Sequence, residues 1–144
     1  MENILNKLKS NDKEMIFEAA ELLLNIFDSY YEWDAQDYIT VMNAVVLKCT
    51  LPEINENREI FDELLDVLEI GAGKNGISSV NFEPLIDVFN NGQHSDLFER
   101  LVIILGFSLQ PKYIDYLNSI DTDDSFVKKE INDAIFELKY SKYD

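Results

Sequence analysis

The chain has 144 residues, of which 47% are hydrophobic, so it is about one ordinary domain that can bury a core without disulfides or a structural metal. Its 12 basic residues stand against 28 acidic ones, and the formal net charge is −16. Such a surface repels nucleic-acid phosphates and anionic membrane headgroups, and it attracts basic proteins. We therefore expect no nucleic-acid or membrane partner, although acidity can also serve solubility alone.

Cysteine content and apolar runs indicate the compartment. Cys49 is the single cysteine, so no disulfide can form within the chain, and its apolar neighbours predict a buried, unreactive thiol. The N-terminus does not resemble a signal peptide, and the longest apolar run, residues 101–105, is five residues long. A membrane span needs about 18. We expect a protein of the reducing cytoplasm.

Helical periodicity dominates the first third of the chain. Apolar residues recur with the 3.6-residue period over residues 15–30, and Asp12 is placed to cap the start of that helix. Asp34 or Asp37 opens the next predicted helix. That helix ends before Pro52, because proline lacks the amide hydrogen that the helical ladder needs.

Residues 57–70 predict an amphipathic helix with one apolar and one acidic face. Gly71 and Gly73 are suitable C-terminal stops for it. Seven acids between Glu53 and Glu69 stand against one arginine, Arg58. Like charges three and four residues apart, with no compensating pair, cost helix stability. This cost favours the hypothesis that the acidic face binds a basic partner.

The second half contains an internal repeat. The pattern of residues 85–91 returns 28 residues later at 113–119, and the helices that follow correspond at an offset of 30. A short helix, a polar turn and a longer helix thus repeat, which resembles HEAT-like repeats over residues 82–140. We expect an all-α fold, a right-handed stack of antiparallel helical hairpins with about seven or eight helices, forming one domain over residues 1–144. An irregular helical bundle is the alternative.

Catalytic motifs are weak. Residues 67–73 look like the first motif of S-adenosylmethionine-dependent methyltransferases, in which a strand runs into a glycine-rich turn. Helical periodicity continues through the supposed strand, so this enzyme remains a remote alternative. The run at 121–125 begins like a calcium loop but has Phe126 where glycine is required. His94, the single histidine, is expected at the surface. We expect no catalytic residue, cofactor or metal.

Three groups of side chains are candidates for binding a partner. The first is aromatic and acidic and lies between the first two long helices, the second is the acidic helix face, and the third is repeated polar positions. The candidate residues are Tyr31, Trp33, Asp37 and Tyr38 in the first group, Glu59, Asp62, Glu63 and Asp66 in the second, and Asp87 and Asp115 in the third.

In its size, acidity and helical-repeat pattern, the chain resembles the immunity proteins of bacterial polymorphic-toxin and contact-dependent inhibition systems. The resemblance implies a non-catalytic inhibitor that neutralises a cognate toxin domain, such as a basic nuclease, by electrostatically assisted binding. It is expected to be a monomer or weak homodimer. A nucleic-acid mimic that inhibits a DNA-binding protein and a generic repeat adaptor are the alternatives.

Overall fold

The computed structural model describes residues 1–29, 34–75, 79–91 and 94–140. Over these residues the chain is all-α and contains no β-strand, as the periodicity predicts. None of the described helices is long and apolar enough to cross a membrane. In chain order the elements are α1 (Glu2–Lys9), α2 (Lys13–Phe27), α3 (Ala35–Cys49), α4 (Pro52–Asn55), α5 (Arg58–Asn75), α6 (Glu83–Asn90), the 3₁₀ helix η1 (Ser95–Leu97), α7 (Phe98–Gly106), the 3₁₀ helix η2 (Pro111–Tyr113), α8 (Ile114–Asn118) and α9 (Ser125–Tyr140).

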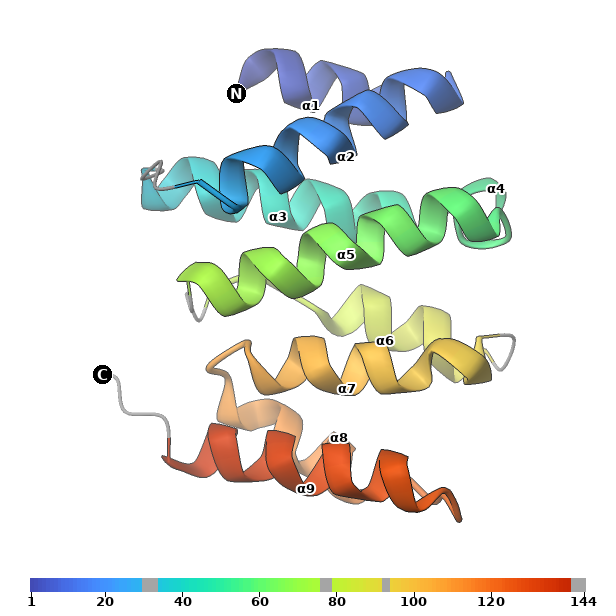
Figure 1. Cartoon of the computed structure of the whole chain (residues 1–144), viewed down its shortest axis with the longest axis vertical. Helices are drawn as coiled ribbons and strands as arrows, with labels where there is room; N and C mark the ends of the chain where they lie inside the picture. The colour runs from blue at the N-terminus through green and yellow to red at the C-terminus, as the bar shows by residue number, and fades with distance from the viewer. Residues whose placement is uncertain (30–33, 76–78, 92–93, 141–144) are drawn as a thin grey trace.

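The helices form two rows along the long axis of the molecule (Figure 1). In the front row α2, α5, α7 and α9 pack in that order, and behind them lie α1, α3, α6 and α8. Each front helix pairs with a rear one: α1 with α2, α3 with α5, α6 with α7, and α8 with α9. The single-turn helix α4, which periodicity does not indicate, forms part of the α3–α5 connection. The all-α class is therefore confirmed, while the HEAT-like character and the handedness of the stack stay predictions.

The internal repeat occupies equivalent places in the two rows. α6 and α8 both lie in the rear row, and α7 and α9 both lie in the front row. Repeated positions also share their burial: Leu85 corresponds to Tyr113, and Leu101 to Ile131, and all four are buried. The rear helices of the two repeats are linked because the backbone N–H of Phe82 donates to the Tyr113 hydroxyl across 2.9 Å.

Helix starts follow the predicted caps. The carboxylate of Asp12 accepts a hydrogen bond from the backbone N–H of Glu14 at the start of α2. Asp34, one of the two residues expected to open α3, accepts from the N–H groups of Gln36 and Asp37. These bonds satisfy amide groups that have no partner within the helix.

The end of α5 differs from the prediction. The helix continues past Gly71 to Asn75, so this glycine does not terminate it. Gly71 instead permits close packing, because a Cβ atom there would lie 2.7 Å from the Met42 Sδ and 3.0 Å from the Phe27 ring. Residues 67–73 are therefore helical, and the strand that the methyltransferase motif requires is absent from that segment.

Cys49 and His94, the two side chains considered for reactivity, both pack against neighbouring residues. Cys49 is fully buried, and burial raises the pKa of its thiol to about 12, as expected for an unreactive cysteine. His94, expected at the surface, is only half-exposed, because its ring packs 4.9 Å from that of Phe61 and 5.9 Å from that of Phe89.

Candidate functional site

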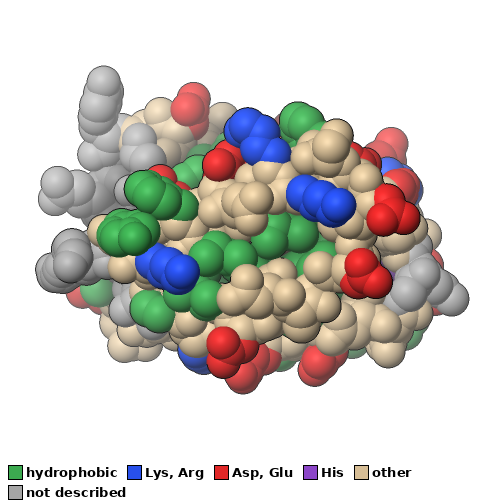
Figure 2. All heavy atoms as spheres, turned by 90° about the horizontal axis from the view of Figure 1, so that it is seen from below, with side chains coloured by type: hydrophobic (Ala, Val, Ile, Leu, Met, Phe, Trp, Pro, Cys, Tyr) green, Lys and Arg blue, Asp and Glu red, His purple; other side chains and the backbone are tan. Residues whose placement is uncertain are grey.

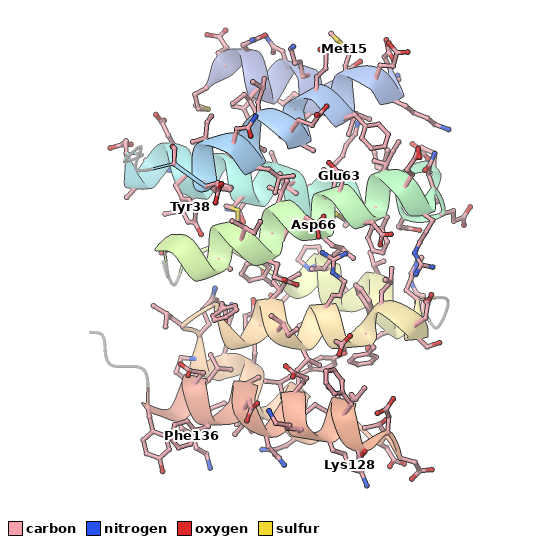
Figure 3. The ribbon with its side chains drawn as sticks, viewed as in Figure 1. Met15, Tyr38, Glu63, Asp66, Lys128 and Phe136 are labelled. Carbon is pink, nitrogen blue, oxygen red and sulfur yellow. The ribbon has the colours of Figure 1, made fainter. Side chains whose placement is uncertain are left out.

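Acidic side chains gather on α5 and on three neighbouring elements, α2, η1 and α7. Figure 3 shows Glu63 and Asp66 on the front of α5. Glu63 interacts electrostatically with Glu21 on α2, and Glu69 does so with Glu99 on α7. We call this group the α5 acidic surface, and it comprises Glu21, Asp62, Glu63, Asp66, Glu69, Asp96 and Glu99.

Two arginines neutralise part of the α5 acidic surface. Arg100 on α7 forms an ion pair with Asp66, and its guanidinium lies 3.6 Å from Asp62 Oδ1 and 3.8 Å from Glu69 Oε1. Arg58 bridges to Asp96 at 2.8 Å and to Asp62 at 3.5 Å. The expectation that the acids of this helix have no compensating pair is thus wrong for Asp62, Asp66 and Glu69, whose contacts with Arg100 help to hold α5 against α7.

One uncompensated part of the surface lies where α2 meets α5. No described cation lies within ion-pair distance of Glu21 or Glu63. Burial raises the pKa of Glu63, and the negative charges of Asp66, Glu21 and Asp62 raise it further. Glu59 is exposed in the first turn of α5, where its negative charge interacts favourably with the helix dipole. Free negative charge is therefore available at Glu21, Glu59 and Glu63.

The aromatic and acidic group expected between α2 and α3 does not form a described surface. Tyr31 and Trp33 lie outside the described residues. Tyr38 is only 1% exposed, and its hydroxyl donates to the Gly71 carbonyl oxygen at 2.8 Å. Its ring therefore belongs to the core and not to the surface at which we expected it. Asp37 is half-buried in the first turn of α3.

The repeated acids Asp87 and Asp115 are both exposed on rear helices, α6 and α8. Asp87 lines an open groove of about 420 Å³ together with Lys112 and Tyr116. Because α5 belongs to the front row, the structure does not bring these residues into the α5 acidic surface. The two surfaces proposed from the sequence are separate.

A second feature of the front row was not predicted. A groove of about 230 Å³ between α7 and α9 is lined by Phe107, which is 44% exposed, and by other residues that include Glu130 and Glu137. The close approach of the two helices depends on Gly106, because a Cβ atom there would lie 3.0 Å from that of Ala134. By the repeat offset of 30, Gly106 corresponds to Phe136 and Ala134 to Ile104, so the repeat pattern does not indicate this contact.

Metal-ligand groups and accessible reactive side chains were sought among the described residues. They contain no group of three or more histidine, cysteine or carboxylate side chains placed to hold a metal ion. The thiol of Cys49 is inaccessible, and the imidazole of His94 packs between aromatic rings. Neither a family model, nor a curated protein, nor a solved structure matches this chain.

Proposed function

We propose that the chain is a non-catalytic inhibitor that binds a basic protein through the α5 acidic surface, and that its target is a bacterial toxin domain such as a basic nuclease. The observation that carries the proposal is the unneutralised pair Glu21 and Glu63. Burial raises the pKa of Glu63, and the negative charges of Asp66, Glu21 and Asp62 raise it further. A lysine or arginine from a partner would relieve that repulsion, so complex formation would be favoured and association accelerated.

The groove between α7 and α9 supplies the apolar contact that an acidic patch lacks. The exposed ring of Phe107 can cover the aliphatic stem of a basic side chain, while Glu130 and Glu137 face its charge. In this proposal Phe107 takes the anchoring role that the sequence suggested for Tyr38. Aromatic anchors of this kind commonly carry much of the energy of an interface.

The toxin target rests on the resemblance to immunity proteins. An inhibitor of a nuclease benefits from carboxylates that occupy the place of the substrate phosphates, because the same basic residues recognise both. A generic adaptor would bind its partner without strong dependence on salt, so ionic strength distinguishes the two functions.

The test compares two variants with equal changes in net charge. Glu21→Lys/Glu63→Lys alters the α5 acidic surface, whereas Asp87→Lys/Asp115→Lys alters the rear row and serves as the control. The immobilised protein captures partners from an extract of the source cells at low and high salt, and mass spectrometry identifies them. The association rate of each captured partner is then measured against ionic strength.

We expect a basic protein to be captured at low salt and to associate at least about tenfold more slowly with Glu21→Lys/Glu63→Lys. The rear-row control should change the rate much less. Equal slowing by both variants would show that only net charge matters. Capture of acidic or neutral proteins alone would overturn the proposal, and a captured basic protein without toxin activity would overturn its toxin part.

A further inference from the structure

A groove between α1 and α3 combines apolar and basic side chains. It has a volume of about 440 Å³ and is formed by the last turns of these two rear helices and the turn that follows α3. This volume lies in the range of about 300–1,000 Å³ that is typical of small-molecule sites. Its described lining contains no carboxylate and includes the apolar Leu8, Ala44, Leu47 and Leu51 and the basic Lys9 and Lys48.

Three other grooves of the described structure have acidic side chains in their lining. The carboxylates are Glu83 and Asp87 between α6 and α8, Glu130 and Glu137 between α7 and α9, and Asp121 and Asp123 between α8 and α9. At the end of the molecule near α8 and α9, Figure 2 shows both acidic and basic side chains around the hydrophobic ones. In a chain of net charge −16, a groove whose charged lining is only basic favours an anionic ligand.

Lys48 supplies the more covered of the two positive charges. Only 9% of this residue is exposed, and its Nζ donates to the Ser10 carbonyl oxygen across 2.9 Å. No described carboxylate lies within ion-pair distance of it. Burial lowers the pKa of Lys48, and the negative charge of Glu53 opposes that effect. Because an ammonium carries three N–H donors, an anion that enters the groove can form charge-assisted hydrogen bonds with Lys48.

The rest of the lining suits a hydrocarbon chain better than a peptide. Leu47 is 58% exposed and Leu51 is 37% exposed, so a ligand that covers them removes apolar surface from water. The Thr50 hydroxyl already donates to the Leu47 carbonyl oxygen across 2.6 Å. The groove therefore offers little to the polar groups of a peptide backbone, which are costly to cover without partners. A hydrocarbon chain carries no such groups.

We propose that the groove between α1 and α3 binds a free long-chain carboxylate of the fatty-acid class, whose headgroup accepts hydrogen bonds from Lys48 while its hydrocarbon chain covers Leu47 and Leu51. Lys9 is exposed and attracts the anion at longer range. The acidic surface of the whole chain repels anionic bilayers, which favours a free carboxylate over a membrane headgroup. The groove belongs to the rear row (Figure 1), so this inference does not rest on the α5 acidic surface or on its proposed function.

Three probes with one hydrocarbon chain and different headgroups test the ligand class. Decanoate, decanol and decyltrimethylammonium are titrated into the full chain below their micelle-forming concentrations, and amide chemical shifts locate the binding. We expect decanoate to shift residues 44–51 with half-saturation below about 1 mM, and the other two probes to bind there at least about tenfold more weakly. Equal binding of all three, or decanoate shifts only elsewhere, would overturn the proposal.

Matched variants test the two contacts. Lys48→Met keeps the aliphatic stem without the ammonium and should weaken decanoate binding at least about tenfold. Lys139→Met removes the same charge from an exposed position on α9 and should leave binding unchanged. Leu47→Gln should weaken binding by about threefold or more, and Leu22→Gln, which alters an exposed leucine on α2, is its control.

Thermal unfolding shows which of these variants are folded. Leu47→Gln alters an exposed side chain, so it tests the groove even if the loss of the Lys48–Ser10 hydrogen bond destabilises Lys48→Met. Decanoate binding that neither variant weakens would overturn the proposal. Binding of phosphatidylglycerol vesicles without binding of decanoate would also overturn it, because the groove would then recognise a membrane surface.

Discussion

The hydroxyl of Tyr38 on α3 donates a hydrogen bond across 2.8 Å to the carbonyl oxygen of Gly71 on α5, and the ring of the same tyrosine packs edge-on against Phe27 of α2, 6.0 Å away. Three helices therefore meet at Gly71, where no room is left for a side chain. This contact explains why α5 continues through a glycine that would ordinarily suit a helix end.

Substitution of the two glycines of α5 should have opposite effects. Gly71→Ala pushes a methyl group into Met42 and Phe27, and we expect it to lower the free energy of unfolding by about 1–2 kcal/mol. Gly73→Ala places its Cβ atom 3.6 Å from the Phe107 ring, an ordinary contact, so the better helix propensity of alanine should raise stability by up to about 1 kcal/mol. Chemical denaturation measures both. Equal stabilisation by the two substitutions would contradict the close packing at Gly71.

The local features of the fold could be predicted, and the features decided by distant contacts could not. Periodicity indicates α2 and α3, and the aspartates Asp12 and Asp34 mark their starts, because a cap depends only on residues a few positions away. A glycine, in contrast, can either end a helix or allow a neighbouring helix to pack closely against it. Which of these Gly71 does is decided by Met42 and Phe27, which belong to other helices.

The same division holds for the candidate site. The acidic face of α5 is visible in the sequence, because it needs only helical spacing. Its neutralisation by Arg100 is not visible, since Arg100 lies 34 residues from Asp66 in the chain, whereas the Arg58–Asp62 pair follows from the i,i+4 spacing. The Phe107 groove depends on how closely α7 approaches α9, which a single helix pattern does not specify.

Arg100 should be more important for stability than Arg58. The Arg100 side chain is 20% exposed and contacts three carboxylates, so Arg100→Gln should cost about 1–3 kcal/mol by leaving Asp66 and Glu69 unpaired. Arg58 is 57% exposed, and Arg58→Gln should change stability little. A double-mutant cycle of Arg100→Gln with Asp66→Asn, measured by denaturation, should give a favourable coupling energy. A coupling energy of zero would show that the ion pair does not stabilise the α5–α7 contact.

Glu63 should make the stability of the protein depend on pH. Burial, with nearby negative charges, raises the pKa of Glu63 in the folded state above its value in the unfolded chain. Stability from this group is therefore complete below about pH 4, the ordinary range of glutamate, and declines as the pH rises through the folded-state pKa. Glu63→Gln should then stabilise the protein at pH 7 by about 0.5 kcal/mol, after allowance for solvent screening.

The control for this pH effect is Glu59→Gln, which removes the same charge from an exposed position of the same helix. Because Glu59 lies in the first turn, where a negative charge is favourable, its loss should not stabilise the protein. Unfolding curves between pH 3 and pH 8 compare the two variants. A gain for Glu63→Gln that persists unchanged at pH 3 would show that repulsion between charges is not its cause.

Two tyrosines of the second repeat should differ in importance although they lie close together. The Tyr113 hydroxyl accepts a buried hydrogen bond from the N–H of Phe82, so Tyr113→Phe leaves that N–H without its partner and should cost about 1–3 kcal/mol. The Tyr116 hydroxyl donates to Asn90 at an exposed site across 3.3 Å. Water can replace that bond, so Tyr116→Phe should cost less than about 0.5 kcal/mol. Chemical denaturation of the two variants, with hydrogen exchange at the Phe82 amide, distinguishes them, and equal losses would mean that this buried bond does not hold α6 to the following repeat.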